Sequence, residues 1–192
     1  MSETEDSAMS EERDADSLEA ILRDFLRHHK YLHEFRLQKL VYILDLVTSL
    51  KEDGKRATDA DFKPYMYGSY SDSLRDTLNG LEGELPTEQD WLYGKVVTKY
   101  LGADHPRVND GNPDGYSQYE DLIEKIREAT AGISNDDLEN WSKESWLYEN
   151  TDYDSEMNFE EVEKHEEEIR EDLLDMFPEL KDEFEDERNS GN

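Results

Sequence analysis

Residues 35–50 read Phe35-Arg36-Leu37-Gln38-Lys39-Leu40-Val41-Tyr42-Ile43-Leu44-Asp45-Leu46-Val47-Thr48-Ser49-Leu50, the most apolar stretch of the chain. Its apolar side chains recur at the three- and four-residue spacing of a helix face. That face consists of Leu37, Leu40, Val41, Leu44 and Val47, and Ile43 widens it. We therefore predict a helix from about Phe35 to Leu50 in the core of the protein, with Gly54 as the stop signal behind it.

A second apolar stripe precedes this helix. Ser17 is a capping residue, and the helix predicted after it carries Leu18, Ile21, Leu22, Phe25 and Leu26 on one face. The segment from His28 to His33 interrupts that period. Residues 1–16 are rich in Ser, Asp and Glu and lack the basic start and apolar centre of a signal peptide, so we expect a disordered acidic N-terminus.

The segment after the apolar helix favours a small amount of β-structure. Residues 62–67 look extended, with Pro64 typical of an edge strand, and Gly68-Ser69 predicts a turn. Ser71 or Ser73 is expected to cap a helix bearing Leu74, Leu78 and Leu81. Residues 91–101 suit a hairpin, because Val96-Val97-Thr98-Lys99-Tyr100 has strand propensity and Trp91, Tyr93 and Gly94 would suit its partner strand.

The second half reads as a loop followed by helices. Gly, Pro, Asp and Asn dominate residues 102–116, and Ser117 and Ser134 are predicted to cap the next two helices. A long acidic amphipathic helix is expected from Asn158 to Phe177, ended by Pro178. It would either dock into a partner or a second copy, or pack back on its own domain.

The predicted fold class is therefore α+β: mainly helical, with a small β-sheet formed by a short hairpin or edge strand. The predicted organisation is a disordered region at 1–16, a compact domain at 17–154, the acidic helix at 155–185 and a disordered tail at 186–192.

The net charge of the chain limits the salt conditions in which it is stable and the kinds of partner that it can bind. The 192 residues include 51 acidic and 21 basic side chains, which gives a formal net charge of −30. Such acidity spread along a folded chain is typical of halophilic proteins, because molar salt screens the self-repulsion; the alternative is an ordinary acidic protein with solvated faces. The charge opposes binding to nucleic acid or anionic lipid.

No apolar run approaches the ~20 residues of a membrane-spanning helix, and the absence of cysteine fits a cytoplasmic protein.

The segment from Arg23 to Lys39 contains the only histidine cluster and the only locally basic stretch. His29 and His33 would share a helix face and could ligate zinc, although spacing supplies no third ligand; the alternative is that these histidines stabilise a helix C-terminus. The basic residues suit either docking to an acidic partner or internal ion pairing.

No phosphate loop, nucleophile elbow or His-Glu-x-x-His motif is present, so we predict neither enzyme activity nor a cofactor.

Tyrosines form the most distinctive local pattern, Pro64-Tyr65-Met66-Tyr67-Gly68-Ser69-Tyr70-Ser71. Tyrosine offers a large contact area, little entropy to lose and a polar group, which suits recognition surfaces. The alternative is packing against the apolar helix, and we expect one or two rings to be buried and one partly exposed. The predicted partner-binding residues are Arg36, Lys39, Tyr65, Tyr67, Gly68, Tyr70 and Ser71.

Two of these stretches, in this order and spacing, resemble a known family. Arg36-Leu37-Gln38-Lys39-Leu40-Val41-Tyr42-Ile43-Leu44 resembles the "LQKLVYxL" helix of SocA-like, or Panacea, antitoxin-domain proteins and of the YwgA-like proteins. Residues 65–72 resemble their "Y-x-Y-G-P-Y-S" segment, with Ser69 in place of Pro. The likeness covers about residues 18–150, including the Trp-containing Ser145-Trp146-Leu147, and leaves out the acidic tail.

The resemblance implies a compact helical domain with a small sheet, and a non-enzymatic antitoxin that neutralises a partner protein by direct contact. We therefore expect an antitoxin-like protein-interaction module in a halophilic cytoplasm. The alternatives are a winged-helix-like DNA-associated regulator, which needs the basic residues from Arg23 to Lys39 on one exposed face, and a YwgA-like protein of another function.

Overall fold

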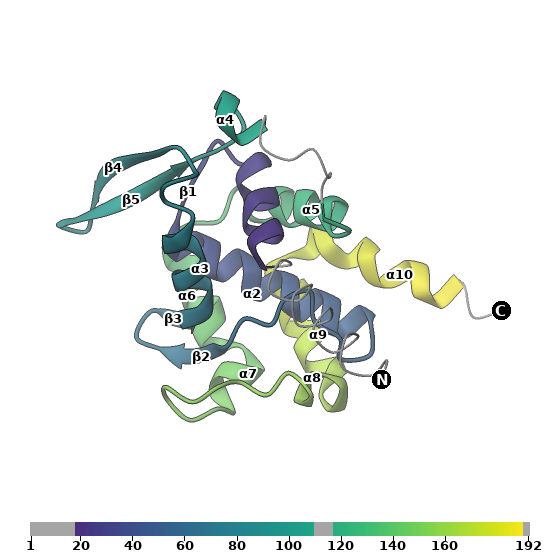
Figure 1. The fold of residues 1–192 in the computed structure, drawn as a ribbon. Coiled ribbons are helices and arrows are strands. Elements are labelled where there is room, and N and C mark those ends of the chain that lie inside the picture. Colours follow the sequence, from purple (N-terminus) through teal and green to yellow (C-terminus); the bar gives the residue numbers. More distant parts are fainter. Residues whose placement is uncertain (1–17, 110–116, 190–192) are drawn as a thin grey trace, which may run out of the picture.

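The computed structural model describes residues 18–109 and 117–189, and it confirms a mainly helical α+β fold with small antiparallel sheets (Figure 1). The first described element is a helix over residues 18–27. The later helices are α2 (Glu34–Lys51), α3 (Asp72–Gly80), α4 (Pro106–Asn109), α5 (Glu120–Thr130), α6 (Asn135–Glu144), α7 (Trp146–Glu149), α8 (Glu161–Lys164), α9 (Glu166–Met176), the 3₁₀ turn η1 (Pro178–Lys181) and α10 (Asp182–Asn189). The predictions for residues 1–16 and 110–116 lie outside the described residues.

Helix α2 runs through the middle of the molecule and is buried on every side (Figure 1). Each residue from Leu37 to Leu50 is buried, including Gln38, Lys39 and Asp45. Such a helix needs partners all round, and the helix over 18–27, the β2–β3 hairpin, α5, α6 and α8 supply them. The predicted central position is confirmed, and the left-handed Gly54 (φ 86°) lies just past the end of α2.

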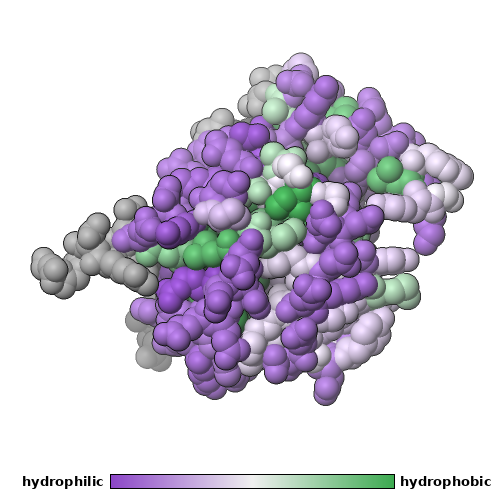
Figure 2. All heavy atoms as spheres, turned by 180° about the vertical axis from the view of Figure 1, so that it is seen from behind, coloured by the Kyte–Doolittle hydropathy of each residue, from purple (hydrophilic) through white to green (hydrophobic). Residues whose placement is uncertain are grey.

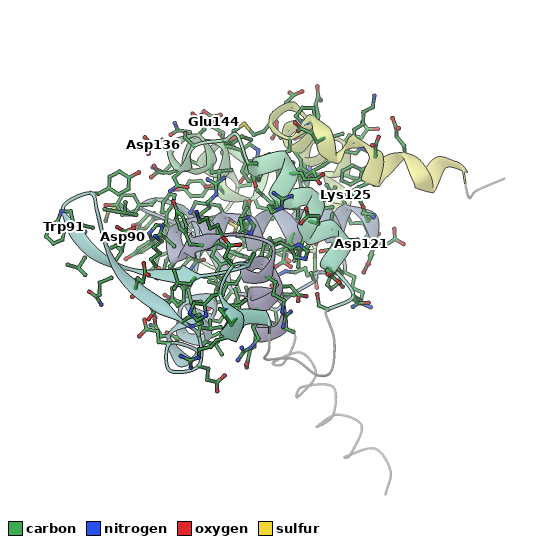
Figure 3. The ribbon with its side chains drawn as sticks, turned by 90° about the horizontal axis from the view of Figure 1, so that it is seen from above. Asp90, Trp91, Asp121, Lys125, Asp136 and Glu144 are labelled. Carbon is green, nitrogen blue, oxygen red and sulfur yellow. The ribbon has the colours of Figure 1, made fainter. Side chains whose placement is uncertain are left out.

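One sheet has the strand order β1 (Tyr31–His33), β5 (Lys95–Leu101), β4 (Thr87–Leu92). The predicted hairpin is present, but its first strand begins earlier, at Thr87, and Tyr93 and Gly94 form the turn between the paired residues Leu92 and Lys95. Tyr93 and Gly94 both have positive φ, as a two-residue type I′ turn requires. The hairpin extends away from the helical body, with Trp91 at its outer end (Figures 1 and 3).

The second sheet is a hairpin of β2 (Phe62–Tyr65) and β3 (Gly68–Ser71), with Pro64 opposite Ser69. The predicted extended segment is confirmed, but the predicted turn at Gly68-Ser69 is wrong. Met66 and Tyr67 form the turn, and Gly68 begins the returning strand with φ of 96°. The left-handed glycine therefore follows the turn, as it does when a bulge closes a hairpin.

Four helix caps are predicted; Ser17 lies outside the described residues, and two of the other three are confirmed. The Ser71 hydroxyl accepts from the Leu74 amide at 3.1 Å, and the Ser134 hydroxyl accepts from the Asp137 amide at 3.1 Å. Ser117 is not the cap of α5, whose N-cap residue is Tyr119. The Ser117 amide instead donates to the buried Asp24 at 2.8 Å and joins this segment to the first described helix.

The long acidic helix predicted from Asn158 to Phe177 is wrong in its continuity, because α8 and α9 are separate helices that meet at His165. The His165 ring stacks on Trp146 at 4.0 Å between centroids, and this contact lies at the break. Pro178 ends α9 as predicted, and α10 then continues to Asn189, into the stretch expected to be a tail.

The C-terminal segment packs back on its own domain. Its buried side chains belong to the same core as α2: Phe159, Val162, Ile169, Leu173, Phe177, Leu180 and Phe184. Polar side chains cover most of the back face (Figure 2). Within the described ranges, no helix combines the length and apolar character needed to cross a bilayer.

Candidate functional site

The two stretches that carry the family resemblance contact each other. The first turns of α2 lie against β3, so that Gln38, Lys39 and Tyr42 face the hairpin and the helices behind it. Gln38 binds the backbone of Ser71 with both ends of its amide, donating to the carbonyl at 2.9 Å and accepting from the N–H at 2.8 Å. Side chains therefore occupy the edge of β3 that faces away from β2.

Lys39 and Ser142 bind the remaining backbone groups at this edge of β3. The Lys39 ammonium donates to the Ser69 carbonyl at 2.9 Å, and the Ser69 amide donates to the Ser142 hydroxyl at 3.2 Å. The edge of β2 is covered as well, because the amides of Asp154 and Met157 donate to Pro64 (2.9 Å) and Phe62 (2.7 Å). Neither strand of this hairpin offers a free edge to another strand.

Lys39 is an unusual residue for this position. Its side chain is buried, with the residue only 1 % exposed, and the ammonium lies 4.6 Å from the centre of the Phe35 ring. Burial lowers the pKa of Lys39 to about 7, although the nearby Glu139 opposes the shift. Lys39 therefore holds the hairpin in place from inside the protein and is not a surface contact.

Gly68 and Ser71 also lie inside. A side chain at Gly68 would collide with the Ser142 hydroxyl and press on Lys39. Ser71 is fully buried as the cap of α3, and its hydroxyl donates to Asp61 at 2.7 Å. Burial tends to raise the pKa of the Asp61 carboxyl, but hydrogen bonds from Ser73 and Ser71 outweigh burial and lower it. These predicted contact residues position the hairpin and the start of α3.

Arg36 points away from the tyrosines. Its guanidinium donates to the carbonyls of Thr130 (2.7 Å) and Ile133 (3.0 Å) and to the Asn135 side chain (2.8 Å). It thereby joins the end of α5 to the start of α6, and partial burial lowers its pKa. The structure does not bring Arg36 together with the tyrosine run.

The exposed or half-buried side chains of the run and Tyr153 form one surface, which we call the tyrosine patch: Tyr65, Met66, Tyr67, Tyr70 and Tyr153. Met66 (58 % exposed) and Tyr67 (54 %) project from the turn, while Tyr65 and Tyr70 are half-buried. Tyr65 lies 5.5 Å from Tyr70 and stacks on Tyr153 at 5.7 Å between centroids. The expectation that one or two of these rings would be buried is wrong, because Tyr67 is exposed and Tyr65 and Tyr70 are only half-buried.

The patch is held by bonds at its base. The Tyr148 hydroxyl donates to the Tyr65 carbonyl at 2.9 Å, and Lys63 bridges Asp72 at 2.9 Å and Asp154 at 2.5 Å. The Tyr70 hydroxyl donates to Glu34 at 3.2 Å, and burial, followed by the charge of Glu34, raises the pKa of Tyr70 to about 12. Sequence reasoning missed Tyr148 and Tyr153, because they join the hairpin only through tertiary contacts from 83 or more residues away.

The basic residues from Arg23 to Lys39 do not share an exposed face. Arg23 pairs with Glu19 and Glu84, Arg27 pairs with Asp24, and Lys39 is buried. The condition set for a winged-helix-like DNA regulator is therefore not met. Internal ion pairing, the alternative for this segment, accounts for Arg23 and Arg27.

His29 and His33 do not share a helix face, because His29 lies in the turn after the first helix and His33 belongs to strand β1. The His29 Nδ1 lies 2.6 Å from the Phe25 carbonyl, and the His33 Nε2 lies 2.9 Å from an Asp90 carboxylate oxygen. Across residues 18–109 and 117–189, no three His, Asp or Glu side chains converge as metal ligands.

Comparisons of the chain with protein-family models, with curated proteins and with solved structures found no match.

Proposed function

We propose that this protein is a non-enzymatic protein-interaction module that binds a partner protein through the tyrosine patch. The observation that carries the proposal is the tyrosine patch itself: three of its five side chains are more than half exposed, and it is built on a hairpin fixed by buried polar bonds. Binding by fixed aromatic side chains loses little conformational entropy, which is why Tyr is common at the energetic centres of interfaces.

The sealed edges of the hairpin favour recognition by side chains over strand addition. A partner strand would find the outward backbone groups of β3 already bonded to Gln38, Lys39 and Ser142. The patch is bordered by charges of both signs: Glu34 lies beside Tyr70, and Asp154 pairs with Lys63, whose ammonium lies 5.0 Å from the centre of the Tyr65 ring. The net charge of −30 favours a partner whose contact surface carries Lys or Arg.

The resemblance to SocA-like proteins extends the proposal to an antitoxin-like role, in which binding covers the active surface of a partner toxin. The chain would do so in the cytoplasm of a halophilic cell, where molar salt screens its charge. In the YwgA-like alternative the patch would bind a different partner. A DNA-associated role is not proposed, because the basic side chains do not share an exposed face.

Site-specific photo-crosslinking in the source cells tests the proposal. A photoreactive amino acid replaces Tyr67 in one variant and Tyr93, the 80 % exposed ring on the β4–β5 hairpin, in a control. We expect a defined adduct with one protein from position 67 and none from position 93. The Tyr67→Ala substitution should then weaken binding of the purified partner at least tenfold, with Tyr93→Ala changing it less than twofold.

Equal crosslinking from both positions would show that exposure alone causes it and would contradict the proposal. An adduct at position 93 alone would move the interface to the β4–β5 hairpin. Mass spectrometry of the adduct identifies the partner, and the presence or absence of toxin activity in that protein separates the antitoxin-like role from the YwgA-like alternative.

A further inference from the structure

An open cleft of about 460 Å³ lies between β1 with the turn before it and the junction of α5 and α6. This volume is typical of small-molecule sites. Six side chains that carry or accept positive charge line it: His28, His29, Lys30, His33, Arg36 and Arg127. No Asp or Glu belongs to the lining, although 51 of the 192 residues are acidic.

Carboxylates outside the lining compensate part of this positive charge. Glu124 lies 2.7 Å from His28 and also pairs with Arg127, and Asp90 lies 2.9 Å from His33. Arg36 and Lys30 differ, because neither forms an ion pair within the described part of the chain. The uncompensated charge of the cleft therefore belongs to these two residues.

The Arg36 guanidinium has more N–H donors than its hydrogen bonds use. A guanidinium carries five N–H groups, and three of those of Arg36 are used by Thr130, Ile133 and Asn135, all neutral oxygen acceptors. These bonds fix the guanidinium plane at the wall of the cleft and leave two N–H groups. A fixed guanidinium with two donors suits a carboxylate or a phosphate, which accept bidentate bonds.

The surroundings of His29 show that positive charges dominate in the cleft. Burial, together with the charges of Arg36, Arg127 and His28, lowers the pKa of His29 to about 4, although the hydrogen bond with the Phe25 carbonyl opposes the shift. A positive environment of this kind stands out in a chain of net charge −30, because long-range repulsion would otherwise keep anions away.

We infer that this cleft is a binding site for a small oxyanion, a carboxylate or phosphate group held by Arg36 and Lys30. Arg36 supplies the bidentate contact from the rigid wall, and Lys30 supplies a mobile charge from the exposed side. The site is separate from the tyrosine patch and does not depend on the protein-interaction role.

The test is a titration of the full chain with inorganic phosphate and, in parallel, with acetate, in potassium chloride of constant high ionic strength. Backbone amide NMR shifts follow binding, and we expect saturable changes at residues 28–33 and 130–135. Phosphate binding without acetate binding would identify a phosphorylated ligand, and the reverse would identify a carboxylate ligand.

Charge-reversed variants decide whether the cleft is responsible. Lys30→Glu should weaken binding at least tenfold, whereas Lys55→Glu, an exposed lysine past the far end of α2, should weaken it less than twofold. Arg36→Lys keeps the charge but removes the fork and should also weaken binding at least tenfold. Equal effects of the two lysine variants, or shifts that do not saturate with either anion, would overturn the inference.

Discussion

Lys39 makes the stability of this protein depend on pH through a single buried amine. Its pKa is lowered to about 7 in the folded state, whereas an unfolded lysine has a pKa near 10.4. Between these values the unfolded chain binds a proton that the folded chain has released, so the contribution of Lys39 to stability rises with pH. Below pH 7 both states are protonated, and the cost of burying the charge is present in full.

Replacing Lys39 with Met should remove this dependence. We expect the free energy of unfolding of the wild type, relative to Lys39→Met, to rise between pH 7 and pH 10 by at most about 1.4 kcal/mol per pH unit. Urea unfolding of both proteins at several pH values measures the difference, and other titrating groups largely cancel in it. A difference that is constant from pH 6 to pH 10 would contradict a lowered pKa for Lys39.

Gly68 disfavours any side chain for two reasons, its backbone conformation and the close contact around it, and Gly94 shares only the first. Its φ of 96° disfavours any side chain, and an added Cβ would strike Ser142. Gly94 has a similar φ of 74° but open space around it. Gly68→Ala should destabilise by about 3–4 kcal/mol, whereas Gly94→Ala should cost about 1 kcal/mol, the backbone contribution alone. Thermal unfolding measures both, and equal losses would mean that the contact with Ser142 relaxes freely.

At the scale of elements, the β2–β3 hairpin depends on helix α2 for its outer edge. Gln38→Leu keeps the volume but leaves the N–H and carbonyl of Ser71 buried without a partner. We expect a loss of about 2–4 kcal/mol, measured by urea unfolding, together with faster proteolysis at the Met66-Tyr67 turn. The matched control is Gln89→Leu on the exposed strand β4, which should change stability by less than about 0.5 kcal/mol.

Element type was largely predictable, and element position was less so. Apolar spacing identified α2, and the strand propensity of residues 96–100 identified β5, because both signals are local, whereas Tyr93 and Gly94 form the turn and not the expected partner strand. The turn at Met66-Tyr67 was misplaced by two residues, since a glycine can lie within a turn or directly after it. The break at His165 could not be predicted, because its stacking partner Trp146 is brought to it by the tertiary fold.

The candidate site was predictable in its tyrosines but not in its basic members. A sequence cannot distinguish an Arg or Lys that faces solvent from one that binds backbone carbonyls. Lys39 and Arg36 both bind carbonyls, of Ser69 and of Thr130 and Ile133, which lie 30 to 97 residues away along the chain. The cleft was missed for the same reason, because its walls come from β1 and from the distant junction of α5 and α6.

At the scale of the whole molecule, the C-terminal helices complete the core and are not an added module. Deleting residues 158–192 would expose the apolar side chains of α2 that contact α8 and would remove seven buried apolar residues. We expect the shortened chain to lose cooperative thermal unfolding and to form large aggregates in light scattering. A monomeric variant that still unfolds cooperatively would show that residues 18–157 fold without the C-terminal helices.

The net charge of −30 predicts a strong dependence of stability on salt. The Debye length falls from about 10 Å at 0.1 M salt to about 3 Å at 1 M, so self-repulsion weakens. The melting temperature should rise by about 10 °C or more between 0.1 M and 2 M potassium chloride. Sucrose at equal osmolality, which adds no ions, should raise it much less, and an equal rise would show that exclusion from the surface is the cause.

The central position of α2 has a consequence for biosynthesis. Its leucine- and valine-rich surface leaves the ribosome before Ile169, Leu173 and Phe177, which belong to the same core and are translated more than a hundred residues later. Final collapse must wait until the C-terminal helices have emerged, and the apolar surface of α2 has to be shielded in the interval. Dense negative charge on the surrounding nascent segments supplies part of that shielding, because it keeps neighbouring nascent chains apart.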